Sequence, residues 1–164
     1  MADVSGSPGA AGSVERVRAA LAAAGHPDTI MAFPDGTRTA ADAAAAVGCT
    51  VAQIAKSIVF RAGERAALIV TSGVNRVDPM RAGTALGVKL ARADADWVRL
   101  VTGFAIGGVA PVGHLTPPLV LLDEDLLALD PVWAAAGSPR HVFRTTAAAL
   151  LRITGAQAAG VRSV

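Results

Sequence analysis

Apolar and polar residues alternate along this chain with two different periods. Apolar positions spaced by three and four residues, opened by Ser, Thr or Asp and in most cases closed by glycine, predict five helices. These helices cover residues 13–25, 39–48, 78–87, 94–101 and 146–153. Shorter runs rich in Val, Ile and Leu predict strands. These strands cover residues 29–33, 56–61, 66–71, 88–91, 119–122, 132–135 and 141–144.

Local signals support several of these boundaries. Asp78 before Pro79 is a cap followed by a proline in the first helical turn. Residues 50–53 have the form of a capping box, which predicts a single helical turn, and residues 63–64 predict a hairpin. Because helices and strands alternate without a regular βαβ spacing, we expect one α+β domain over 14–164. Its mixed sheet, with flanking helices, is expected to curl into an open barrel.

The composition narrows the class of protein. The chain has 164 residues, and its 52% apolar share is rich in alanine, so we expect a core of small aliphatic residues with Trp97 and Trp133 inside it. The small and polar residues 1–13 predict a disordered tail. A single cysteine, Cys49, and the lack of an apolar run of about 18 residues favour a cytoplasmic protein. The net charge of +2 fits brief contact with a nucleic acid but predicts no long phosphate footprint.

The segment 102–113, TGFAIGGVAPVG, contains four glycines and a proline between two apolar stretches. Glycine allows the backbone to approach a ligand closely or to adopt a positive φ, and Pro111 stiffens the loop. Successive unpaired amides of such a loop can form a nest for an anion or a carbonyl oxygen. A sharp connection between strands with no ligand is the alternative.

Lys56 is the ionisable residue of greatest interest. In a strand it shares one face with Ile58 and Phe60. An ammonium at the edge of an apolar face loses hydration and gains from any nearby anion. In the alternative interpretation, Lys56 extends to solvent at the end of its strand.

Other residues give weaker signals for chemistry. Nucleotide-binding and hydrolase motifs are absent, and one Cys with three His makes a zinc site hard to assemble, so we expect no metal. Cys49 is a small core residue or a thiol acidified by the next helical turn. His114 is a loop histidine, His141 faces a cleft or solvent, and the acidic residues 123–125 cap the turn that follows them.

Three segments together resemble the YbaK/EbsC-like family. They are VAQIAKSIVF, ALGVKLARADADWVRLVTGFAIGGVAPVG, and GSPRHVF followed by ALLRITGA. This family includes the editing domain inserted in bacterial prolyl-tRNA synthetases and free-standing relatives that deacylate mischarged tRNA. The similarity runs from about residue 33 to residue 161, and the combination of Q-I-x-K-S with T-G-F-x-x-G-G-V-x-P-x-G is specific.

The resemblance implies a barrel-like α/β fold of the prolyl-tRNA synthetase-associated type, with a pocket between the lysine strand and the glycine loop. It implies hydrolysis of the ester joining a wrong amino acid to the 3′-terminal adenosine of tRNA, without a metal or cofactor. Lys56 matches the lysine needed for deacylation, and Gly107 and Pro111 match the ends of the family's G-x-x-x-P loop. Phe33 and His141 lie where relatives carry an aromatic residue and, in the inserted domains, often a histidine.

The glycine loop and Lys56 are suited to hydrolysis of an aminoacyl ester. The amides near Gly107, Gly108 and Val109 are candidate donors to the developing oxyanion. Lys56 would hold the terminal phosphate, the ribose oxygens or the oxyanion by its charge. Water would attack the ester, or the thiol of a misattached cysteine would cyclise on it. We therefore expect deacylation of a small amino acid such as Cys or Ala from tRNA, with tRNA-Pro as the expected carrier.

Two other functions remain open at this stage. One is a non-catalytic module that binds the 3′ end of tRNA or an aminoacyl-tRNA synthetase. The other is a binding protein that uses the glycine nest for a free nucleotide. The expected partners are the aminoacyl-tRNA 3′ end and a synthetase, with no DNA and no membrane.

Overall fold

The structure is a computed structural model that describes residues 10–37 and 39–164. Within these residues the chain forms five α-helices, two short 3-10 helices and eight strands. The helices are α1 (Ala10–Ala23), α2 (Ala40–Val47), η1 (Val51–Gln53), α3 (Pro79–Leu86), α4 (Ala95–Thr102), η2 (Glu124–Ala128) and α5 (Ala147–Thr154). The strands are β1 (Ile30–Ala32), β2 (Ile54–Ala62), β3 (Arg65–Ser72), β4 (Ala91–Arg92), β5 (Leu119–Asp123), β6 (Val132–Ser138), β7 (His141–Thr145) and β8 (Gln157–Ala159). No helix in the described part of the chain is long and apolar enough to cross a membrane.

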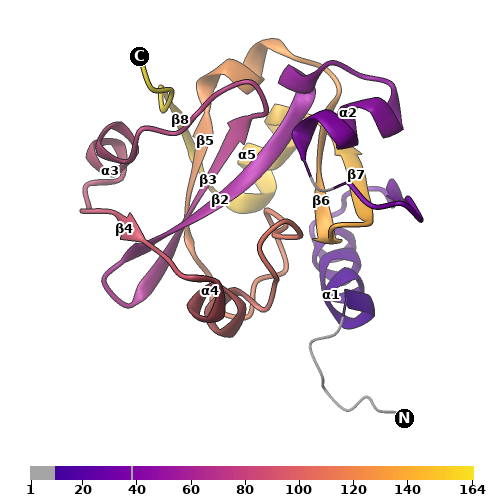
Figure 1. The fold of residues 1–164 in the computed structure, drawn as a ribbon, viewed down its shortest axis with the longest axis horizontal. Helices are drawn as coiled ribbons and strands as arrows, with labels where there is room; N and C mark the ends of the chain where they lie inside the picture. Colours follow the sequence, from indigo (N-terminus) through magenta and orange to yellow (C-terminus); the bar gives the residue numbers. More distant parts are fainter. Residues whose placement is uncertain (1–9, 38) are drawn as a thin grey trace.

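The strands of the described residues form one mixed sheet in the order β1-β7-β6-β2-β3-β5-β8, with β4 paired to β2 off this path. The β2–β6, β3–β5 and β5–β8 pairs are parallel, and the other pairs are antiparallel. The terminal strands β1 and β8 do not pair with each other, so the sheet curls without closing (Figure 1). The prediction of an α+β fold with a mixed sheet in an open barrel is confirmed.

Strand β2 organises the centre of the molecule because its two edges are paired differently. One edge pairs with β3 along residues 55–62. The other edge pairs with β6 only at Ile54 and Ala55, and with β4 only at Phe60 and Arg61. Residues in between have no strand partner on that edge, so β2 and β6 diverge. The loop that follows α4 lies between their diverging ends (Figure 1).

Two of the three apolar clusters in the described residues lie on opposite faces of the sheet. Consecutive residues of a strand point to opposite faces, and here Ile54 and Ala55 belong to different clusters, as do Trp133 and Ala134. Helix α1 contributes to the larger cluster, which contains Ala55 and Ala134. Helix α2 contributes to the smaller cluster, which contains Ile54 and Trp133. The sheet therefore has α1 packed on one face and α2 on the other.

The predicted helix boundaries are largely confirmed because they depend on caps, which act locally. Four side chains accept a hydrogen bond from a backbone amide of the first turn: Thr39, Asp78, Asp94 and Thr146. Four glycines with positive φ end helices: Gly48, Gly87, Gly103 and Gly155. The single turn at 51–53 is also present, with Gln53 Oε1 accepting from the Thr50 amide at 3.0 Å.

Two predicted boundaries are wrong, and one strand was not predicted. Helix α1 begins at Ala10, so Ser13 lies inside the helix, where it is buried against neighbouring elements rather than capping the helix. Residues 1–9 of the predicted tail 1–13 lie outside the described residues. Strand β4 has only two residues, because residues 88–90 lead from α3 before pairing with β2 begins. Strand β8 was not predicted, since its short sequence has no alternating pattern and it forms by pairing with β5.

The two tryptophans differ in burial. Trp133 is 9% exposed and belongs to the cluster under α2, as predicted. Trp97 is only half-buried at the rim of the larger cluster, and the Arg61 guanidinium stacks on its ring with 4.5 Å to the centroid. The prediction of a core position is therefore confirmed for Trp133 and only partly correct for Trp97.

Candidate active site

The divergence of β2 and β6 opens a cavity of about 550 Å³ on the α2 side of the sheet. Its walls come from five parts of the chain that are distant in sequence. They are α2 with the loop before it, η1 with β2, the turn after β3, the glycine loop, and the β6–β7 pair. Most wall residues are small or aliphatic, and the larger wall residues include Trp133 and Ile106. The cavity therefore has the form of a binding pocket with few polar groups.

Lys56 pairs with Thr71 of β3, has no strand partner on the other edge of β2, and lines this cavity. Among the described residues it forms no ion pair, and no other charged side chain lines the cavity. Burial lowers the pKa of the Lys56 ammonium from its usual value, because the charged form loses hydration. An anion or a polarised carbonyl oxygen in the cavity would recover part of that lost solvation.

The glycine loop lines the same cavity through Ile106, Gly107 and Val109. Gly107 has a φ of +96°, a conformation that side-chain-bearing residues rarely adopt. The Gly108 amide already donates to the Ala105 carbonyl at 2.9 Å. In the described part of the chain, no hydrogen-bond acceptor is found for the amides of Gly107 and Val109. Together with the Ile106 amide, which also has no described acceptor, these amides are the candidate donors that the cavity-lining part of the loop offers to a ligand.

Gly108 has a different role in the geometry. A Cβ on Gly108 would lie 2.8 Å from Ser138 Cα and 2.9 Å from its carbonyl carbon. The loop backbone thus packs directly on the end of β6, which only glycine permits. Gly108 does not line the cavity, but its close contact with Ser138 sets how near the loop approaches β6.

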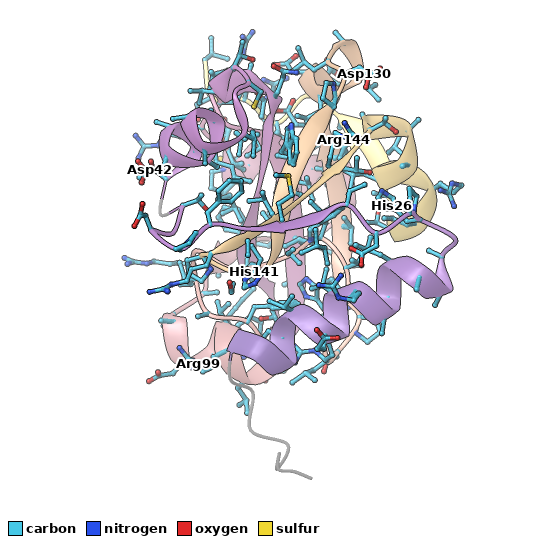
Figure 2. All side chains as sticks on the ribbon, turned by 90° about the vertical axis from the view of Figure 1, so that its right-hand side faces the viewer. His26, Asp42, Arg99, Asp130, His141 and Arg144 are labelled. Carbon is cyan, nitrogen blue, oxygen red and sulfur yellow. The ribbon has the colours of Figure 1, made fainter. Side chains whose placement is uncertain are left out.

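Three other predicted site residues also lie off the cavity wall. Phe33 packs against the apolar cluster under α2, next to wall residues such as Trp133. Pro111 is buried and lines a separate hollow of about 260 Å³ on the other side of the glycine loop. His141 lies at the end of the β6–β7 hairpin nearest α1 (Figure 2). The structure thus brings Lys56, Gly107 and Val109 together and places the others around them.

A hydrogen bond joins His141 to Ser138. The Ser138 hydroxyl oxygen accepts from the Arg140 amide at 3.0 Å and lies 2.6 Å from His141 Nδ1, with which it shares a hydrogen bond. Ser138, which sequence reasoning did not single out, therefore links His141 to the backbone beneath Gly108.

Sequence reasoning also missed polar groups of the cavity wall. Thr37 and Thr39 line the cavity from the loop before α2, and Thr37 Oγ1 donates to the Pro139 carbonyl at 2.8 Å. Ser57 is a lining residue whose hydroxyl is buried and has no hydrogen-bond partner among the described residues. The position of Ser57 directly after Lys56 in the Q-I-x-K-S motif was the available signal. No comparable signal marks the two threonines.

The remaining candidate residues lie outside the cavity. Burial raises the pKa of the Cys49 thiol, which argues against an acidified nucleophile there. Asp123 is buried, accepts hydrogen bonds from Thr71, Ser72 and Asn75, and caps η2 through the Asp125 amide. The capping role predicted for 123–125 is thus confirmed. Among the described residues, no group of three or more His, Cys, Asp or Glu could hold a metal ion.

Comparison with known proteins identifies the class. The family model of the aminoacyl-tRNA editing domain matches residues 34–153, and the chain belongs to this family. The resemblance to the YbaK/EbsC-like family is thereby confirmed.

Individual relatives agree with this assignment. The chain is 30% identical over 135 residues to the uncharacterized protein YwhH of Bacillus subtilis (strain 168), covering 82% of this chain and 86% of that protein. It is 48% identical, with a TM-score of 0.87, to the crystal structure of a protein proposed to be a trans-editing enzyme for prolyl tRNA synthetase. That match covers 93% of this chain and 98% of the other. The structure of hypothetical protein APE2540 matches with a TM-score of 0.83 at 26% identity, over 90% of this chain and 99% of that chain.

Proposed function

We propose that this protein is a cytoplasmic trans-editing hydrolase that deacylates mischarged aminoacyl-tRNA. The substrate would be a small amino acid, such as Cys or Ala, esterified to tRNA-Pro. The observation that carries the proposal is the convergence of the Lys56 side chain with the free amides of Gly107 and Val109 on one cavity. The family assignment and the 48% identical relative proposed to edit for prolyl tRNA synthetase support it.

The proposed reaction is an ester hydrolysis. Water attacks the carbonyl carbon of the aminoacyl group, and the carbonyl oxygen becomes an oxyanion. The bond to the ribose oxygen then breaks, and that oxygen takes up a proton, which yields free amino acid and tRNA with a 3′-terminal hydroxyl. In the alternative route, the thiol of an attached cysteine attacks its own ester and the ribose oxygen leaves in the same way.

Each residue has a defined task in this scheme. The amides of Gly107 and Val109 donate hydrogen bonds to the oxyanion, and one such donor contributes about 3 kcal/mol to transition-state stabilisation. The Lys56 ammonium supplies positive charge beside the oxyanion, the ribose oxygens or the terminal phosphate. Because an aminoacyl ester is already activated, neither route requires a Ser-His-Asp triad or a cofactor.

Selectivity would come from the size of the cavity. Its wall includes Ala40, Ala43 and Ala134, with the indole of Trp133 closing one side. A methylene group is worth only about 1–3 kcal/mol in binding, which is why small amino acids escape discrimination by a synthetase. A cavity that admits small side chains and excludes larger ones would act as the second sieve.

A deacylation assay on a panel of mischarged tRNAs tests the proposal. We expect Lys56→Ala to lower kcat/KM on the preferred substrate by about 100-fold, since the charge that stabilises the transition state is lost. Lys89→Ala is the matched control, because Lys89 is an exposed lysine that does not line the cavity.

Three results would contradict the proposal. Equal activity of Lys56→Ala and wild type would remove the catalytic role of the ammonium. Tight binding of charged tRNA by the wild type without faster release of amino acid would favour the non-catalytic module instead. Retention of free nucleotide but not of tRNA would favour the nucleotide-binding protein.

A further inference from the structure

A single side chain of α1 holds both ends of the glycine loop. Arg16 Nη2 donates to the Gly103 carbonyl at 2.8 Å, and Arg16 Nε donates to the Gly113 carbonyl at 2.9 Å. The same guanidinium lies over the Phe104 ring, 4.9 Å from its centroid. Because a guanidinium is planar and rigid, two bonds from one group set the separation of the carbonyls that they bind.

The two glycines at the loop ends are required by this contact. Gly103 and Gly113 have φ values of +82° and +80°. A Cβ on Gly103 would lie 2.5 Å from Arg16 Nη2, and one on Gly113 would lie 3.2 Å from the Arg16 carbonyl oxygen. Helix α1 therefore packs closely against both ends of the loop, and glycine suits both positions because their positive φ is one that other residues rarely adopt.

Two aromatic rings support the loop from behind. The Phe104 and His114 rings meet edge to face with centroids 5.1 Å apart. His114 Nε2 lies 2.7 Å from the Ala110 carbonyl, so it carries the hydrogen. Burial lowers the pKa of His114, and the positive charge of Arg16 lowers it further, so the ring stays neutral at pH 7. Arg16, Phe104 and His114 thus form one packed unit behind the cavity-facing amides.

The environment of Arg16 sets it apart from the neighbouring arginine of α1. Its guanidinium is partly buried, its pKa is lowered by burial, and among the described residues it forms no ion pair with a carboxylate. Its donors go to loop carbonyls instead. Arg18, two residues later, is more exposed and pairs with Glu15 and Asp28. The loop contact is therefore a property of Arg16 and not of arginines on α1 in general.

We infer that Arg16 is a positioning residue for the reaction. By bridging the Gly103 and Gly113 carbonyls it fixes the span of the loop, and this holds the amides of Gly107 and Val109 toward the cavity. The inference rests on the proposed function, since it assigns α1 a role in orienting the oxyanion donors. Arg16 itself does not line the cavity and does not touch the substrate.

Kinetics of Arg16 variants and of two control variants test this role. We expect Arg16→Met and Arg16→Lys to lower kcat by about 10- to 100-fold with KM changed less than about threefold, because misplaced donors affect the transition state more than binding. Lysine retains the charge but cannot bridge both carbonyls. Arg18→Met is the matched control on the same helix and should keep wild-type kcat. Added methylguanidinium should restore part of the activity of Arg16→Ala but none of the activity of Lys56→Ala.

A readout that does not depend on activity separates this inference from the proposed function. Amide hydrogen exchange and ¹⁵N shifts of Gly107 and Val109 should change in Arg16→Lys and stay as in wild type in Arg18→Met. Unchanged amides, or wild-type kcat in Arg16→Lys, would overturn the inference. A loss of kcat that disappears at a temperature at which the variant is fully folded would also overturn the inference. Absence of deacylation by the wild type, with the amide changes present, would refute the proposed function alone.

Discussion

At the scale of single residues, Lys56 is held with its charge partly removed from water and without a neutralising carboxylate among the described residues. This arrangement is unfavourable for the folded protein, because the ammonium loses hydration and gains no ion pair. It is favourable for a ligand that brings negative charge. The residue is therefore better explained by binding of a substrate than by the stability of the fold.

The lowered pKa of Lys56 predicts a pH dependence. In the proposed reaction the ammonium is the form that assists catalysis, and it is lost as the pH rises through its pKa. Because burial places that pKa below the usual 10.5, the enzyme-catalysed rate should start to fall at a lower pH than for an ordinary lysine.

The measurement is kcat/KM for deacylation against pH after subtraction of spontaneous ester hydrolysis. It is paired with an NMR titration of the Lys56 side chain, assigned by its absence in Lys56→Ala. The two midpoints should agree. A rate that stays constant through the titration of Lys56 would rule out the ammonium as the active form.

At the scale of elements, the glycine loop is held on one side and open on the other. Arg16 and His114 bind its carbonyls from the α1 side, and Gly108 packs on Ser138. Only the stretch around Gly107 faces the cavity. A rigid support behind the Gly107 and Val109 amides is the arrangement that pre-organised donors require.

The two central glycines should respond differently to alanine. A Cβ on Gly107 meets nothing within 4 Å, so Gly107→Ala costs only the strain of a positive φ, about 1–2 kcal/mol. We expect its kcat to fall by about 10-fold or more, because the free amide turns away from the cavity. In Gly108→Ala the added Cβ has no open space and must displace the loop from Ser138. We therefore expect a larger loss in the free energy of unfolding, about 1–3 kcal/mol.

Gly63→Ala is the control for this pair. Gly63 has a φ of +65°, a Cβ added there would meet no atom within 4 Å, and the residue lies in the β2–β3 turn away from the cavity. Gly63→Ala should lose similar stability to Gly107→Ala in thermal unfolding but keep wild-type kcat. Equal kcat for Gly63→Ala and Gly107→Ala would show that the loop conformation does not matter for the reaction.

At the scale of the whole molecule, the charge is nearly balanced, with 15 Lys and Arg against 13 Asp and Glu. The described residues of the cavity wall include one cationic side chain. Recognition of the ester there would therefore depend little on contacts with a long stretch of tRNA phosphates. Discrimination among tRNAs would be loose, or would be supplied by a partner synthetase.

The balance of charge predicts a weak salt dependence. With one or two phosphate contacts, KM for charged tRNA should rise less than about tenfold between about 50 and 200 mM salt. The measurement is steady-state deacylation over that range, with kcat followed separately. An increase of about a thousandfold would reveal an extensive phosphate-binding surface and would contradict the cavity-centred interpretation.

Element boundaries and part of the site could be predicted from the sequence because their signals are local. Asp78 and Asp94 cap helices through amides two or three residues away, so neither depends on the rest of the fold. The motif around Lys56 and the glycine loop carried the family resemblance. The strand β8 was missed, since it forms only by pairing with the distant strand β5.

The sequence by itself determined the order of the five α-helices and of the strands β1 to β7, the family, and the residue types available for chemistry. Only the tertiary structure decided which of these residues lie close together. Lys56 and Gly107 line one cavity because β2 and β6 pair at Ile54 and Ala55 and then diverge. Arg16 reaches the ends of the loop across 87 and 97 residues of chain. Such contacts depend on how the sheet curls and how α1 packs on it. No local sequence pattern encodes the curl of the sheet or the packing of the helix.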